Sequence, residues 1–292
     1  MALPEAGEAA RLLQSLLGRA NSRGASYVSS GVQARSDDVG GRGIFATRAL
    51  SEGEELLRIS HSALVTASIG QKYPDGQALR RVADGIEAGA DWPPGVVVKA
   101  APGETAPDFP NEETYIVLAL VLEDAMRCRA TPESDAATLA VLANDGQDNS
   151  EFDQARRQMY YAALPTLEEL RKTHPLFMVP DIVPALEQPT PLQLVENPPI
   201  MPPAVHAAVV NCGLSVGEGT AESAAVEYWS AIVSMHQTVA SEYRSLCAIL
   251  GEDFAKSHSA DEWLYCWAMV MSRNFLLEIG DPNFGGAVFA SM

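Results

Sequence analysis

The feature that most constrains the fold is a change of residue pattern along the chain. Between Val28 and Ile59 the sequence consists of short segments rich in Val, Ile and Thr, broken by glycines. This pattern is typical of β-strands joined by tight turns. Further along, apolar residues recur at helical spacing, first in Tyr115–Met126 and later in Ala221–Leu250. The sequence therefore predicts an α+β protein, with short strands first and helices after them.

Two stretches crowded with proline and glycine divide this plan. Asp91–Pro110 predicts a long surface loop, and Gln188–Pro203 separates two helical segments. Leucines at helical spacing in residues 5–20 predict a short N-terminal helix. Four parts follow: an N-terminal helix in 1–26, a β-rich part in 27–110, a helical part in 111–258, and a final part in 259–292.

Composition excludes several classes of protein. The longest apolar runs are much shorter than the roughly 20 residues that span a bilayer, and no secretory signal pattern opens the chain. We therefore expect no membrane association and a cytoplasmic or nuclear location. The formal net charge of −18 argues against binding to nucleic acid and would favour a basic protein substrate. The four cysteines are widely spaced, so no metal site is expected.

Two helix starts carry a capping pattern. Thr166 with Glu169, and Ser259 with Glu262, have the spacing at which each side chain can bind a backbone amide of the other. After the second pair come Trp263 and other apolar residues at helical spacing, which predict a helix with Trp263 and Trp267 in the core.

The glycine-rich run Gly41-Arg42-Gly43-Ile44-Phe45-Ala46 supports two interpretations. It fits the GxGxxG/A pattern of dinucleotide-binding enzymes, in which a helix must begin directly after the glycines. However, Ile44–Leu50 has the composition of a strand and is followed by a Ser51–Glu54 turn. These residues favour a hairpin in which Ile44–Leu50 pairs with the segment that ends at Ile59. A hairpin that binds no ligand is the plain alternative.

The whole run from Gly41 to Glu54 resembles the opening of SET domains, which commonly read GRGIFA and continue into a Gly-Glu turn. In that family the glycine turn presents main-chain groups to S-adenosylmethionine, because a Cβ atom would block the approach. The resemblance implies that Gly41, Arg42 and Gly43 bind this cofactor, with Arg42 contributing its main chain.

Three further segments resemble the Rubisco large-subunit methyltransferase-like branch of SET proteins. Tyr115–Leu120 is similar to the helix that opens the branch's helical insertion, and Tyr160–Pro165 is similar to its YL..LP element. Asp261–Phe275 is similar to a helix that ends in a Ser-Arg-x-Phe signature. The resemblance implies a SET fold of small mixed β-sheets with a helical insertion, and it places Arg273 in the cofactor pocket, where a guanidinium suits a carboxylate.

The resemblance implies an S-adenosylmethionine-dependent protein-lysine N-methyltransferase, although histidine methylation is also known in this branch. In the family an Asn-His motif and an active-site tyrosine follow the strand that Ala287–Met292 resembles. These residues do not occur in the 292-residue sequence, so no catalytic residue is assigned and the activity of this chain alone is left open. Tyr160, Tyr161, His236 and His258 are given no catalytic role. A non-catalytic SET-like module that binds a protein partner is the second hypothesis.

Overall fold

The structure is a computed structural model, and it describes part of the 292 residues. The described residues are 27–37, 41–58, 64–97, 109–128, 157–158, 160–161, 164–179, 221–277 and 288–291. The expected helix in 1–26, the loop residues 98–108 and the Gln188–Pro203 stretch lie outside them. The chain divides into two compact units, and each unit combines segments that are far apart in the sequence. The first contains Met1–Ala67, Leu122–Leu164 and Arg273–Met292, and the second contains Ser68–Val121 and Pro165–Ser272.

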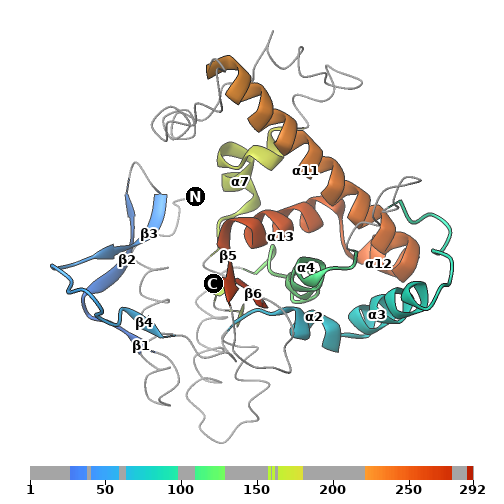
Figure 1. The fold of residues 1–292 in the computed structure, drawn as a ribbon, viewed down its shortest axis with the longest axis horizontal. Helices are drawn as coiled ribbons and strands as arrows, with labels where there is room; N and C mark the ends of the chain where they lie inside the picture. Colours follow the sequence, from blue (N-terminus) through green and yellow to red (C-terminus); the bar gives the residue numbers. More distant parts are fainter. Residues whose placement is uncertain are drawn as a thin grey trace, which may run out of the picture. The chain divides into compact units, whose positions relative to one another are not determined.

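The strands of the first unit form two-stranded antiparallel ribbons (Figure 1). β1 (Tyr27–Val28) pairs with β4 (Leu57–Arg58), and β2 (Val32–Asp37) pairs with β3 (Gly41–Ala46). β5 (Asn274–Leu277) pairs with β6 (Val288–Ser291), as expected from the strand-like end of the sequence. The strands predicted between Val28 and Ile59 are therefore confirmed. The α+β class is also confirmed, because the helices occupy other parts of the chain.

The predicted pairing of Ile44–Leu50 with the segment ending at Ile59 is wrong. β3 pairs with the strand before it, in a register that sets Asp37 opposite Gly41 and Val32 opposite Ala46. Only residues 38–40 connect these two strands, so the pairing requires the closure of a short loop, which costs less chain entropy than that of a long one. The segment after β3 instead returns to β1, where the Ser29 amide donates to the Leu56 carbonyl at 2.8 Å.

The second unit is helical. Its longest helix is α11 (Ala221–Leu250), whose bounds match the predicted segment, and α12 (Glu252–Ser257) and α13 (Ala260–Arg273) follow it (Figure 1). Gly251 joins α11 to α12 at a φ of 89°, a conformation that glycine adopts without strain. The remaining elements are α2 (Ala67–Lys72), α3 (Pro74–Glu87), α4 (Glu112–Leu122), α7 (Leu167–Thr173) and the 3-10 helix η3 (Pro175–Phe177). Both α3 and η3 pack against α11.

The predicted capping boxes can be compared with the hydrogen bonds at two helix starts. At α7 the box is confirmed, because the Glu169 amide donates to Thr166 Oγ1 at 3.1 Å and the Thr166 amide donates to Glu169 Oε2 at 2.6 Å. At α13 the Glu262 amide donates to Ser259 Oγ at 3.2 Å, which is the first half of the predicted box. The Glu262 carboxylate lies 3.4 Å from His258 Nδ1. Local sequence therefore determines where these helices begin.

Helix α4 is more deeply buried than its sequence suggested. The spacing of its apolar residues predicts a half-buried helix, but every residue from Thr114 to Val121 is buried. In α13 the residues from Glu262 to Val270 are likewise all buried, and Trp263 and Trp267 are 1% and 7% exposed, as predicted for core residues. No helix in the described ranges is long and apolar enough to cross a membrane.

The burial of α4 depends on a close approach between main chains. A Cβ atom built on Gly70 of α2 would lie 1.9 Å from the Tyr115 carbonyl oxygen of α4. A Cβ atom on Gly76 of α3 would lie 2.0 Å from the Gly70 carbonyl oxygen. Since both obstacles are backbone atoms, a side chain at either position would push the helices apart.

We expect Gly70→Ala to lower the free energy of unfolding by about 1–3 kcal/mol or more, because α2 and α4 must separate to admit the methyl group. Gly85→Ala is the matched control. It lies in α3, and its Cβ atom would meet nothing closer than Ala90 Cβ at 3.9 Å. That substitution should raise the free energy of unfolding by about 0.4–1 kcal/mol. Urea unfolding followed by circular dichroism measures both, and similar effects of the two substitutions would contradict the close approach.

Candidate functional site

The glycine residues expected to contact a cofactor lie within a strand. Gly41, Arg42 and Gly43 are the first three residues of β3, paired with Asp37, Ser36 and Arg35 of β2. The expectation of a turn at these glycines is therefore wrong, because the reversal of the chain comes before Gly41. The helix required by the dinucleotide interpretation is also absent from residues 41–58, where β3 gives way to bends and a turn.

The strand conformation sorts the three positions onto two faces. Successive residues of a strand alternate between its faces, so positions 41 and 43 share one face and position 42 lies on the other. On the face shared by positions 41 and 43, β3 has no Cβ atom at either position, because both residues are glycine. We call this face the glycine face: at these two positions β3 itself carries no side chain, and the paired residues Asp37 and Arg35 of β2 lie on the same face.

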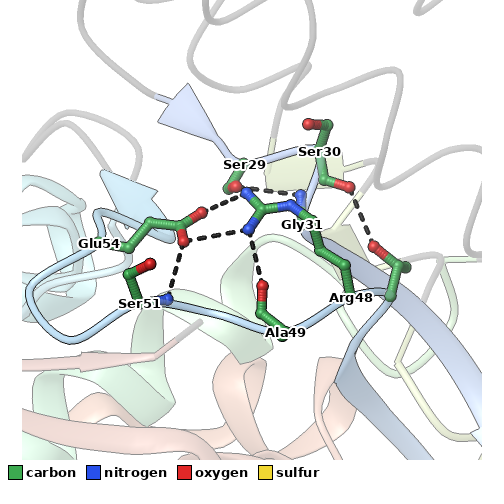
Figure 2. A network of polar contacts seen from close by, with 8 residues as sticks. Ser29, Ser30, Gly31, Arg48, Ala49, Ser51 and Glu54 are labelled. Atoms are coloured by element: carbon green, nitrogen blue, oxygen red, sulfur yellow. Dashed lines mark hydrogen bonds and ion pairs between the residues drawn. The ribbon is translucent and has the colours of Figure 1, made fainter.

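The segment that leaves β3 is held by an ion pair (Figure 2). Arg48 makes two hydrogen bonds to the Glu54 carboxylate, one from Nη2 to Oε1 and one from Nη1 to Oε2 at 3.1 Å. Nη1 also donates to the Ala49 carbonyl at 2.9 Å, and the Ser51 amide donates to Glu54 Oε2 at 3.1 Å. We call Arg48, Ser51 and Glu54 the clasp. It closes the Ser51–Glu54 turn, in which Gly53 has a φ of 78°.

Thr47, next to the clasp in sequence, ties this segment to the two residues that precede β2. The Thr47 amide donates to the Gly31 carbonyl at 2.9 Å, and Thr47 Oγ1 donates to the Ser30 carbonyl at 3.1 Å. A Cβ atom on Gly31 would lie 2.9 Å from both Arg48 Nη2 and Leu50 Cδ2, so glycine gives these side chains their room. The turn predicted at Ser51–Glu54 is confirmed, and it is anchored to the strand ribbon.

The charge state of Glu54 suits a structural role. The hydrogen bond from Arg48 is the main cause that lowers the pKa of Glu54, and the Ser51 amide lowers it further. The carboxylate is thus held ionised and fully engaged in hydrogen bonds. This arrangement positions the chain after β3 rather than transferring protons.

The second expected cofactor residue, Arg273, lies at a junction. It is the last residue of α13, and β5 begins at the next residue, Asn274. The Ser-Arg-x-Phe signature therefore spans the end of a helix and the start of a strand. The side chains of Arg42, Arg273 and Phe275 lie outside the described part of the structure.

The sequence analysis missed a buried charged network. Glu123, directly after α4, accepts two hydrogen bonds from Arg157 Nε and one from Nη2, at distances of 2.7–3.1 Å. The Tyr161 hydroxyl donates to Glu123 Oε2 at 2.7 Å. Burial, together with the neighbouring Glu123 carboxylate, raises the pKa of Tyr161 well above its usual value. Tyr161 is fully buried, as expected for a core residue. In the sequence, the one indication of this network was an acidic residue, Glu123, placed directly after the apolar run of α4.

The described histidines differ in their surroundings, and His258, for which the sequence suggested no carboxylate partner, lies within ion-pair distance of one. Burial lowers the pKa of His236 on α11. His258 lies beside Glu262, and its carbonyl accepts a hydrogen bond from the Tyr243 hydroxyl at 2.6 Å. This contact ties α11 to the junction between α12 and α13. Within the described ranges, no group of three or more His, Cys, Asp or Glu residues could hold a metal ion.

None of the family models, curated proteins or solved structures compared with the chain matches it.

We expect Arg157→Ala to lower the free energy of unfolding by about 3–5 kcal/mol, because the buried Glu123 carboxylate loses its guanidinium partner. Arg171→Ala is the control, since its ion pair with Asp261 has side chains that are 56% and 59% exposed. Removing that surface pair should cost about 0–1 kcal/mol. Chemical unfolding of both variants measures the difference. Losses of equal size would show that the Glu123 network contributes no more than a surface pair.

Proposed function

We propose that the chain is an S-adenosylmethionine-dependent protein-lysine N-methyltransferase of the SET type. The observation that carries the proposal is the set of similar segments, which occur along the sequence in the family's order. GRGIFA forms a strand followed by a Gly-Glu turn. The Ser-Arg-x-Phe signature ends a helix and enters a strand, and β6 occupies the final segment that resembles the next strand of the family.

The glycine face of β3 fits the proposed cofactor. Positions 41 and 43 carry no Cβ atom, so a flat or extended ligand can reach their main chain. β2 pairs along the length of β3, and the clasp fixes the chain that follows β3. In this proposal Gly41, Arg42 and Gly43 contribute main-chain groups, and Arg273 contributes a guanidinium for a carboxylate.

The cofactor, when bound, would supply a methyl group on a sulfonium: the amine nitrogen would bond to the methyl carbon as the C–S bond breaks in line, and a neutral thioether would leave. A substrate lysine must arrive uncharged, although its pKa in water is about 10.4. The net charge of −18 favours a basic protein substrate. Methylation of histidine instead of lysine would use the same cofactor.

The test is calorimetric titration of the folded chain with S-adenosylmethionine, with folding checked by circular dichroism. We expect Gly41→Val to weaken binding by tenfold or more, roughly 1.4 kcal/mol, because a branched side chain would cover the glycine face. Valine suits a strand, so the ribbon should persist. Arg42→Ala keeps the main chain and should change the affinity little.

Two other outcomes have distinct meanings. Equal losses in both variants would count against main-chain recognition by β3. A wild-type chain that is folded and binds no cofactor would overturn the proposal and favour a non-catalytic module that binds a protein partner.

A further inference from the structure

A second buried carboxyl group lies between α11 and α13 in the helical unit. Glu242 on α11 is 4% exposed, and Trp267 on α13 donates its indole N–H to Glu242 Oε2 at 2.7 Å. Trp267 is itself 7% exposed. An indole is a neutral donor, so this hydrogen bond does not supply the positive charge that a buried carboxylate needs.

The charged groups on the surrounding elements do not compensate Glu242. Glu113, in the first turn of α4, acts on it with a charge of the same sign. On α11 itself, the Arg244 guanidinium donates to the Ala240 carbonyl and Ser241 Oγ. The Tyr243 hydroxyl donates to the His258 carbonyl.

The remaining groups near this part of the unit act on other residues. On α13 the Glu262 carboxylate lies beside His258. On α3, the charges of Arg80 and Asp84 act on Tyr115 of α4. Among the described residues, the only charge that shifts the pKa of Glu242 is therefore negative.

Glu242 thus differs from Glu123, a buried acid that is held by an arginine fork. Burial is the main cause that raises the pKa of Glu242 to about 7; Glu113 adds to the rise, and the Trp267 hydrogen bond opposes it. A protonated carboxyl group can accept the indole hydrogen bond without a buried charge. The burial of Glu242, its neutral indole donor and the negative charge of Glu113 all favour a protonated Glu242 in mildly acidic solution.

We propose that the contact between α11 and α13 is a proton-dependent latch, closed while the Glu242 carboxyl is protonated and loosened when it ionises. The folded protein binds this proton more tightly than the unfolded chain, whose glutamate has an ordinary pKa of 4.5. The stabilisation is therefore complete below about pH 4.5 and is lost as the pH rises towards about 7.

The test compares urea unfolding at about pH 5 and about pH 8, followed by circular dichroism, in the full chain and its Glu242→Gln variant. Glutamine has the same shape and can accept the indole hydrogen bond, but it does not ionise. Relative to this variant, the unfolding equilibrium constant of the wild-type chain should rise on the order of 100-fold between the two pH values. Glu252→Gln on α12 is the matched control, because Glu252 is exposed and pairs only with Lys256 among the contacts described. It should retain the wild-type pH dependence.

Glu113→Gln provides an independent arm if Glu242→Gln fails to fold. Removing the like charge lowers the pKa of Glu242, so the pH dependence should shrink without disappearing. The proposal is overturned if Glu242→Gln unfolds with the same pH dependence as the wild-type chain. It is equally overturned if Glu113→Gln leaves that dependence unchanged.

Discussion

The helical unit depends on the close approach of α2 to α4 at Gly70. The contact brings backbone against backbone, so it leaves no room for a side chain to adjust. It allows α4 to be covered on every side from Thr114 to Val121. A helix surrounded in this way cannot supply a polar face, and the unit must therefore place its charged residues on other helices or at the ends of α4.

The three buried acids of the described residues, of which Glu123 belongs to the first unit, differ in their partners. Glu123 has an arginine fork and a tyrosine hydroxyl, which allow it to remain charged. Glu262 lies beside His258 at the start of α13. Glu242 receives a neutral indole N–H and faces a second acid, so protonation is its way of avoiding a buried charge. For Glu242 burial is the main cause that raises the pKa, and the Glu113 charge adds to the rise.

Local patterns in the sequence predicted the elements but not their partners. α11, the α7 capping box and the strands near Val28–Ile59 follow from spacing, composition and turn residues within a few positions. The partner of β3 was mispredicted. The Gly-Glu turn suggested that β3 pairs with the segment after this turn, whereas β3 pairs with β2 and the segment after the turn pairs with β1. The burial of α4 and the network of Glu123 with Arg157 depend on residues far apart in the sequence, and no local pattern specifies them. For the candidate site, the sequence predicted Gly41, Gly43 and Arg273 as cofactor residues, and the structure corrects the conformation of the glycines from a turn to a strand.

The ribbon that carries these glycines is a two-stranded sheet, which on its own is marginally stable in water. Glycines within a strand weaken it further, because they add chain entropy and contribute no side-chain contacts. The clasp and the Thr47 contacts at the end of β3 offset part of that cost. A ligand that binds to the glycine face would stabilise the ribbon by mass action, in proportion to its affinity for the folded strands.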